Sequence, residues 1–243
     1  MIIKMLVRKQ DRTVTYINVD RAKTAIADFT PRARCYDLYI NSVSHKKLTK
    51  VILDATKVSK EDRILDIACG TGFVLKYLPP KTYKCGVDLC RAMLQKVPEW
   101  ADAHKVQAHA CALPFHDDTF NVITCIGAIN IFDDDELHQV LTEVVRVLKE
   151  RGRFMVTVPA FPTPTLYDYL LYPFIYPLVK AYNRFLSTIS GSNVTIEYYK
   201  RDINTITKIF EGHFDEVEAF IRNDTYRGGM GVKSGFGIVV GNK

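Results

Sequence analysis

The sequence predicts an α/β fold built on a doubly wound, mostly parallel sheet. Three observations support this prediction. Strand-length apolar runs alternate with helical patterns between residues 63 and about 160, the first run leads into a glycine loop, and two strand-like runs follow near the C-terminal end. Such alternation indicates parallel strands joined by right-handed crossovers. With 243 residues, of which 47% are hydrophobic, the chain can bury one sizeable core, so we expect one domain over 1–243.

Each expected element is defined by its own pattern. The parallel strands are predicted at residues 63–67, 83–88, 104–108, 121–126 and 153–158. The clearest helix is predicted at 135–150, where leucine and valine recur at helical spacing and Gly152 supplies a stop. The acidic run 133–135 suits the N-terminus of that helix. The remaining predictions are a helix after the glycine loop, a helix at 201–210, and closing strands at 214–222 and 235–240, one of them antiparallel.

Two further regions are expected to flank the sheet. Residues 32–56 have a helical pattern, and we assign about 1–57 to a helical N-terminal cap. Residues 160–190 are expected to form an aromatic-rich lid insertion, because eight aromatic side chains and several prolines fall within 160–186.

Composition limits the setting of the protein. The six cysteines form no C-x-x-C pair and are interpreted as free thiols, which favours a reduced, cytoplasmic compartment. Residues 1–7 lack the apolar run of a signal peptide, and the longest apolar run, 170–179, is too short and too rich in proline to span a bilayer. The net charge of +6 is compatible with anionic lipid, RNA or phosphate-bearing partners, and singles out none of them.

The first predicted strand ends in Asp66 and leads into a loop that contains Gly70 and Gly72. Glycines are needed there because the backbone must turn tightly and approach a ligand at the carboxyl end of the strand. A dinucleotide fingerprint, G-x-G-x-x-G, would need a third glycine where Leu75 stands. The loop therefore disfavours a pyrophosphate ligand.

The string D-x-x-C-G-T-G instead resembles the first motif of class I S-adenosylmethionine-dependent methyltransferases, whose fold is Rossmann-like. The resemblance implies that Gly70 and Gly72 lie along the methionine part of S-adenosylmethionine, with Asp66 near its ammonium group. We place Ala68 in the same binding loop. An ordinary strand-to-helix turn is the alternative.

The second predicted strand ends in a single acidic residue, Asp88, 22 positions after Asp66. A carboxylate at that place can accept hydrogen bonds from both hydroxyls of a ribose, so Asp88 is the predicted ribose ligand. Leu89 is expected to cover one face of adenine, and a plain core contact is an equally compatible role.

The stretch 109–123, HACALPFHDDTFNVI, resembles the D-A-x-x-L-P-F-x-D-x-x-F-D pattern of the same family. That pattern places an aspartate beside the adenine amine, and His109 stands in its position. A neutral histidine can accept a hydrogen bond from the amine, whereas a protonated one only donates, so acid is expected to weaken binding. In the alternative, His109 points to solvent and the backbone of Ala110 recognises adenine.

Candidates for the reacting end come from two regions. After the strand at 121–126, Gly127 would let backbone carbonyls approach the ammonium group, and Asn130 would face the methyl group or cap the following helix. Tyr36 and His45 are candidate bases if the acceptor must lose a proton, and packing or surface polarity is the alternative for both. No metal is expected, because the sulfonium methyl group is already activated.

Together with the segment YDLYIN at 36–41, these motifs resemble the ubiquinone and menaquinone biosynthesis C-methyltransferase family. The resemblance implies a methyltransferase with S-adenosyl-L-homocysteine as product. We expect a small apolar or amphipathic acceptor, namely a quinol precursor, a lipid or an aromatic metabolite, with peripheral membrane contact. The alternatives are an RNA-modifying or small-amine or hydroxyl methyltransferase, a dinucleotide oxidoreductase, and a nonenzymatic cofactor-binding module. The sequence does not indicate the oligomeric state.

Overall fold

The computed structural model describes residues 4–7, 15–34, 36–39, 42–160, 198–199, 201–227 and 233–243. The predicted lid at 160–190 therefore lies, apart from the backbone of Ala160, outside the described residues. Among the residues that are described, no helix has the length and apolar character needed to cross a membrane.

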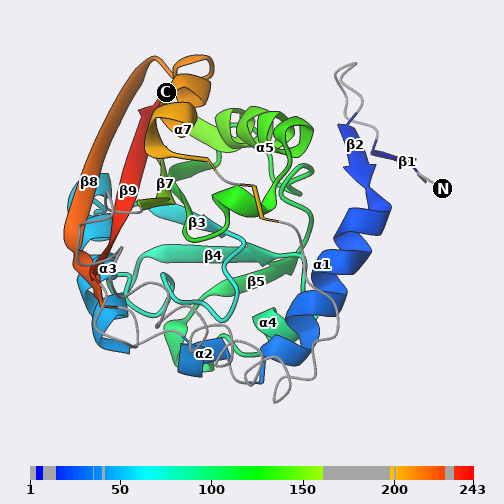
Figure 1. Ribbon diagram of the computed structural model, residues 1–243, viewed down its shortest axis with the longest axis horizontal. Helices are drawn as coiled ribbons and strands as arrows, with labels where there is room; N and C mark the ends of the chain where they lie inside the picture. Colours follow the sequence, from blue (N-terminus) through cyan, green and yellow to red (C-terminus); the bar gives the residue numbers. More distant parts are fainter. Residues whose placement is uncertain are drawn as a thin grey trace, which may run out of the picture.

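Within the described ranges, a seven-stranded sheet forms the centre of the molecule, in the order β5-β4-β3-β6-β7-β9-β8 (Figure 1). Its strands are β3 (Arg63–Ile67), β4 (Tyr83–Asp88), β5 (His104–Gln107), β6 (Phe120–Cys125), β7 (Leu148–Ala160), β8 (Glu216–Arg227) and β9 (Lys233–Asn242). The first five strands are parallel, and β9 is antiparallel to both β7 and β8, between which it lies. The predicted doubly wound, mostly parallel sheet with an antiparallel closing strand is confirmed.

Successive residues of a strand point to opposite faces, and both faces of this sheet are covered. Leu65 and Phe154 belong to a buried cluster with α5 (Asp134–Val147) and α7 (Ile203–Glu211). Their neighbours Ile64 and Met155 belong to a second cluster with α3 (Ser42–Thr56). The two-sided burial explains why β3, β4 and β6 carry apolar residues at neighbouring positions rather than only at every second one.

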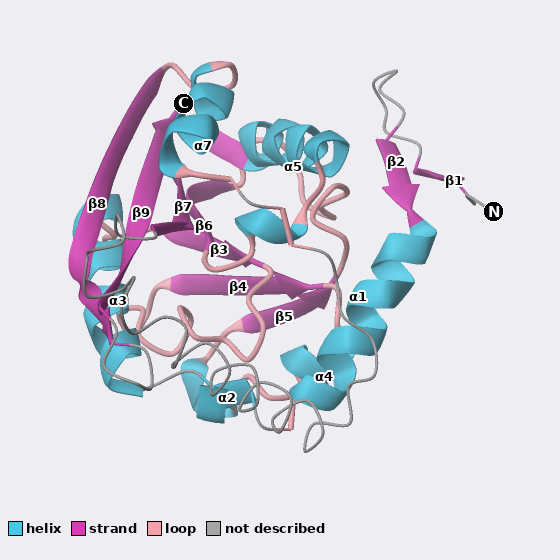
Figure 2. Ribbon diagram, in the orientation of Figure 1, coloured by secondary structure: helices cyan, strands magenta, loops and turns pink. Residues whose placement is uncertain are grey.

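The other elements lie before the sheet or within its connections (Figure 2). They are β1 (Lys4–Val7), β2 (Thr15–Asn18), α1 (Val19–Arg32), α2 (Tyr36–Tyr39), α4 (Arg91–Leu94), and the 3-10 helices η1 (Glu99–Ala101) and η2 (Ile129–Ile131). β1 and β2 pair antiparallel in a sheet of their own at the start of α1. The predicted helical run at 32–56 is thus divided between α2 and α3. Helix α1 lies within the region assigned to the helical cap, although its bounds were not predicted.

Two other predicted helices need correction. The helix before β7 ends at Val147 rather than at residue 150, because Leu148 adopts an extended conformation (φ −80°, ψ 131°) and pairs with Phe120 of β6. The segment after the glycine loop is a series of turns rather than a helix, although Leu75 is buried there as expected.

The N-terminal cap of α5 is confirmed. The Asp133 side chain accepts a hydrogen bond from the Glu136 amide at 2.8 Å, and the Glu136 carboxylate accepts one from the Asp133 amide at 3.2 Å. This reciprocal capping box satisfies two backbone donors that the helix leaves free.

Candidate functional site

A cavity opens at the carboxyl ends of β3, β4, β5 and β6. β3 and β6 are neighbours in the sheet, and the chain leaves them in opposite directions, which makes this edge the topological switch point where α/β sheets bind ligands. Eight of the twelve predicted site residues line the cavity: Tyr36, Ala68, Gly70, Asp88, Leu89, His109, Ala110 and Gly127. Asp66, Gly72 and Asn130 are not on its wall, and the side chain of His45 in α3 lies outside the described residues.

The loop after β3 has left-handed backbone at Ala68 (φ +53°), Gly70 (φ +54°) and Gly72 (φ +81°). The two glycines have different reasons for being there. Gly70 lines the cavity, and within the residues that the structure describes a Cβ at that position would have only Tyr36 Cε1, at 3.8 Å, within 4 Å. A Cβ at Gly72 would lie 2.9 Å from Val97 Cγ1, so Gly72 allows the loop to pack against the protein.

Helix α2, which is not part of the sheet, contacts this loop and the turns after it through side-chain hydrogen bonds. Thr71 Oγ1 donates a hydrogen bond to Asp37 Oδ1 at 2.6 Å, and Lys76 Nζ lies 3.1 Å from Asp37 Oδ2. These contacts bring the YDLYIN segment, through Tyr36 and Asp37, against the glycine loop.

Asp88 ends β4 with both carboxylate oxygens already held by backbone. Oδ2 accepts from the Gly70 amide and Oδ1 from the Cys90 amide, each at 2.8 Å. Burial raises the pKa of Asp88, and these two amide donors partly oppose the increase. A carboxylate has about four lone-pair sites, so about two remain available toward the cavity.

Asp66 lies beneath the glycine loop and is almost fully buried. Its Oδ1 accepts a hydrogen bond from Thr124 Oγ1 at 2.7 Å. Burial raises the pKa of Asp66 to about 7, against the effect of the Thr124 bond, and the nearby charge of Asp88 adds to the increase. Asp66 therefore holds its proton more tightly than an ordinary aspartate.

His109 lines the cavity beside Ala110, and burial lowers its pKa. The Cys111 amide donates a hydrogen bond to His109 Nδ1 at 3.2 Å. Because Nδ1 accepts, the neutral ring carries its proton on Nε2, which makes Nε2 a donor. This arrangement opposes the expectation that neutral His109 accepts a hydrogen bond from an amine.

The opposite wall of the cavity follows β6. Gly127 has left-handed backbone (φ +73°), its amide donates to Thr157 Oγ1 at 2.9 Å, and a Cβ there would have no heavy atom of the described part of the chain within 4 Å. Asn130 lies in η2, where its buried side-chain oxygen has no hydrogen-bond partner among the described residues.

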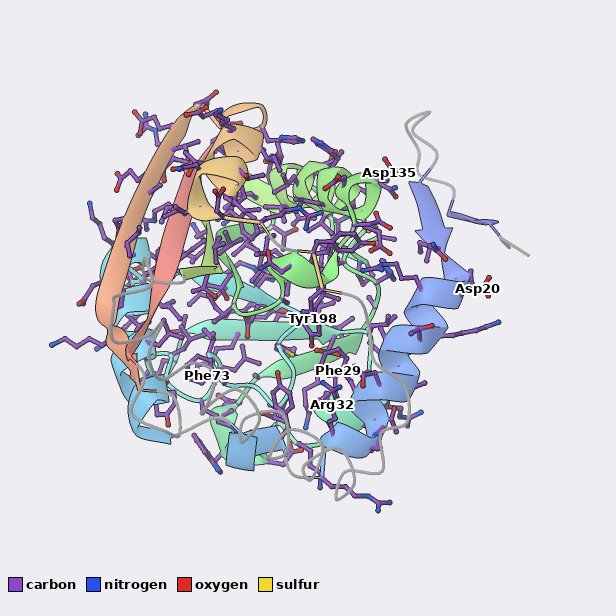
Figure 3. The ribbon with its side chains drawn as sticks, in the orientation of Figure 1. Asp20, Phe29, Arg32, Phe73, Asp135 and Tyr198 are labelled. Carbon is purple, nitrogen blue, oxygen red and sulfur yellow. The ribbon has the colours of Figure 1, made fainter. Side chains whose placement is uncertain are left out.

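Sequence reasoning missed the part of the wall that comes from α1 and from Tyr198. Phe29 and Arg32 of α1 line the cavity with Tyr198 and Tyr36. Figure 3 shows Phe29, Arg32 and Tyr198 close to one another near the carboxyl ends of β4 and β5. The Phe29 and Tyr36 rings meet edge to face, with centroids 6.5 Å apart, and the Arg32 guanidinium carbon lies 5.6 Å from the Phe29 ring centre. Phe29 and Arg32 lie close to Tyr36 in the sequence and Tyr198 lies far from it, so no local motif marks these residues as one wall.

Comparison with known proteins gives a consistent family signal. Residues 64–152 match the family model described as a methyltransferase domain. The chain is 32% identical over 125 residues to the uncharacterized methyltransferase YcgJ of Bacillus subtilis, an alignment that spans 49% of each chain and so about half of that relative. It is 25% identical over 197 residues to a demethylmenaquinone methyltransferase of Listeria welshimeri, covering 76% of this chain and 82% of the relative.

Solved structures agree in fold. The crystal structure of YcgJ superposes with a TM-score of 0.54 at 20% identity, covering 80% of this chain and 97% of that one. A Thermotoga maritima S-adenosylmethionine-dependent methyltransferase, described as a possible histamine N-methyltransferase, superposes with a TM-score of 0.59 at 17% identity, covering 90% and 99%. At these identities the likeness concerns the fold alone.

Proposed function

We propose that this chain, which carries a class I S-adenosylmethionine-dependent methyltransferase domain, transfers a methyl group to a small apolar or amphipathic acceptor. One observation carries the proposal. A single cavity joins Asp88 and the bare backbone of Gly70 to a wall of aromatic side chains from Phe29, Tyr36 and Tyr198. The region around Asp88 and Gly70 suits a nucleoside, and the aromatic wall suits an apolar acceptor.

The described residues fit the cofactor. Asp88 keeps lone pairs for the ribose hydroxyls after accepting two backbone hydrogen bonds. Gly70 and Gly127 leave open the space that a side chain would fill, so a ligand can lie against their backbone. Asp66, under the loop, would offer its negative charge to the methionine ammonium group from beneath.

His109 would donate through Nε2 to a ring nitrogen of adenine, while a backbone group at Ala110 would serve the exocyclic amine. This assignment follows from the hydrogen bond that Nδ1 accepts from Cys111. Leu89, on the same wall, would cover a face of the base.

Bound S-adenosylmethionine supplies a methyl group already activated by the sulfonium charge. The task left to the chain is to align an acceptor and exclude water. Burial, with the charges of Tyr198 and Asp88, raises the pKa of Tyr36 to about 12. A hydroxyl with that pKa stays protonated at neutral pH, so Tyr36 would orient the acceptor by donating a hydrogen bond rather than act as a base. Asn130 and His45 remain candidates for the acceptor side.

An aromatic or quinol-like acceptor is the substrate class that we favour within this proposal. Phe29, Tyr36 and Tyr198 offer faces and edges for stacking a ring, and a relative of comparable length is named a demethylmenaquinone methyltransferase. The interpretation of residues 160–190 as an acceptor lid and the peripheral membrane contact stay predictions.

The test has two stages. Calorimetric titration with S-adenosylhomocysteine should give saturable binding, and methyl-labelled S-adenosylmethionine should then label a quinol or phenol in a panel that also contains phospholipids, small amines and RNA. Tyr36→Phe should lower turnover on the labelled acceptor with little change in cofactor affinity. Labelling of RNA or amines alone would contradict the acceptor class, and an absence of S-adenosylhomocysteine binding would contradict the function itself.

A further inference from the structure

Helix α1 bridges the cavity and is held differently at its two ends. Its residues Ala22, Ala25, Ile26 and Phe29 recur at helical spacing and line the cavity. The C-terminal end of α1 is held mainly by apolar packing, in a cluster formed by Ala33, Cys90, Met93, Phe29 and Tyr36, where the Thr30 hydroxyl also lies 3.5 Å from Cys90 Sγ. The N-terminal end is held by polar contacts.

Those polar contacts converge on Arg21, whose side chain is 13% exposed. Nε donates to Glu136 Oε2 at 2.9 Å, Nη1 donates to the Tyr199 hydroxyl at 3.2 Å, and Nη2 donates to the Ile131 carbonyl. Glu136 is also the residue that completes the capping box of α5. One side chain of α1 thus reaches both η2 and α5 across the cavity, whose wall includes Arg21, Ile131 and Glu136.

Tyr199 is held at the place where Arg21 meets η2 and α5. Its amide donates to the Asn130 carbonyl at 2.8 Å, and its ring lies near two guanidinium groups, 4.9 Å from that of Arg21 and 5.1 Å from that of Arg201. Arg201 in turn donates to the Phe132 carbonyl at 2.8 Å and to Asp134 Oδ1 at 2.6 Å. These bonds attach residues 199 and 201, which follow the cavity residue Tyr198, to η2 and α5. Arg21 of α1 contacts the same two elements.

We propose that Arg21, Glu136 and Tyr199 form a clasp that controls the exchange of the nucleoside ligand. The inference rests on the proposed function, because it concerns the ligand of that cavity. Water can replace the hydrogen bonds of the clasp when it opens, whereas the apolar cluster at the other end of α1 has no such substitute. The helix therefore swings about the cluster around Ala33, and its N-terminal half uncovers the cavity. Arg21 is a positioning residue in this scheme.

The test measures rates. Surface plasmon resonance with immobilised protein gives association and dissociation rates for S-adenosylhomocysteine. Arg21→Ala should raise the dissociation rate about tenfold or more, because several hydrogen bonds to a charged group are lost, and it should not slow association. Tyr199→Phe, which removes one of those bonds and keeps the ring, should raise the dissociation rate about two- to fivefold. Lys23→Ala, at an exposed position of the same helix, should change neither rate.

A second readout needs no ligand. Hydrogen exchange in the free protein should accelerate in residues 19–26 of Arg21→Ala and stay unchanged in residues 27–32 beside the apolar cluster. Either of two results would refute the clasp: an unchanged dissociation rate in Arg21→Ala, or hydrogen exchange that accelerates equally along α1. The proposed function would still stand if the wild-type protein binds S-adenosylhomocysteine. If Arg21→Ala does not fold, Arg21→Lys and Tyr199→Phe decide by the same two measurements. Wild-type protein that binds no S-adenosylhomocysteine would refute the proposed function, and the clasp with it.

Discussion

Replacing Asp66 with asparagine is expected to stabilise the ligand-free protein at and above neutral pH. The pKa of Asp66 is about 7, against an ordinary value of 3.8. A difference of this size corresponds to about 4 kcal/mol between the two protonation states, and the full amount opposes folding at pH values above both pKa values. Asparagine keeps an oxygen that can accept the hydrogen bond from the Thr124 hydroxyl, but the bond is no longer charge-assisted. We therefore expect the free energy of unfolding to rise by about 1–3 kcal/mol.

The stability difference between Asp66→Asn and the wild type should depend on pH. Below the unfolded pKa of 3.8 the carboxyl is protonated in both states, so its raised folded-state pKa costs nothing. As the pH rises toward about 7, the unfolded chain releases the proton while the folded chain retains it, and the free energy of unfolding of the wild type falls. The advantage of Asp66→Asn should therefore grow between about pH 4 and pH 7 and stay level above that range.

Urea denaturation followed by circular dichroism, at about pH 5 and about pH 8, measures this difference. Asp102→Asn is the matched control, because Asp102 is exposed and asparagine tolerates its left-handed backbone (φ +50°). The control should retain the pH dependence of the wild type. A variant at Asp66 that is less stable at about pH 8, or whose advantage is the same at both pH values, would refute the reasoning. The same variant should bind S-adenosylhomocysteine more weakly if Asp66 balances the ammonium group.

Three further predictions concern the cavity. Asp88→Ala should weaken S-adenosylhomocysteine binding by about 1.5–3 kcal/mol, and an unchanged dissociation constant by calorimetry in a folded variant would exclude the ribose role. Gly72→Ala should lower the free energy of unfolding by about 2–4 kcal/mol, because its backbone is left-handed and a Cβ would lie 2.9 Å from Val97, whereas Gly127→Ala should cost about 1–2 kcal/mol for backbone strain alone. Equal losses in urea titrations would contradict that distinction. Because Nε2 of His109 donates in both the neutral and the protonated ring, wild type and His109→Gln should show the same dependence of affinity on pH between about 5 and 8. A steeper loss in acid for the wild type would mean that the ring accepts instead.

The sequence predicted the central strands best. The bounds of β3 and β4 coincide with the predicted 63–67 and 83–88, because strands buried on both faces carry apolar residues at neighbouring positions. β7 is longer than predicted, since its first residues include Lys149, Glu150 and Arg151, which carry no apolar pattern. Pairing with β6 at Leu148 extends the strand, and such pairing depends on the fold rather than on local composition.

The prediction of the site was good where a motif marks a strand end and poor where distant elements meet. Gly70, Asp88 and His109 belong to local motifs and lie on one cavity wall. The bounds of α1 and its place on the cavity wall were not predicted, because the helix contains Pro31 and turns small side chains such as Ala22 to the cavity, which weakens its apolar periodicity. The bond from Arg21 to Glu136 joins residues 115 positions apart, and no local pattern encodes it.

The interior position of β9 has a consequence for the folding of the chain. β9 follows every other strand in the sequence, yet it separates β7 from β8 and pairs with both. Until residues 233–242 have been synthesised and have docked, both of those strands present unpaired backbone, and unpaired strand edges attract other chains. Docking of β9 should therefore come late in folding and be the step most exposed to aggregation. Substitutions that weaken it, such as those at Gly241, where a Cβ would lie 2.4 Å from the Phe214 ring, should reduce the yield of soluble protein.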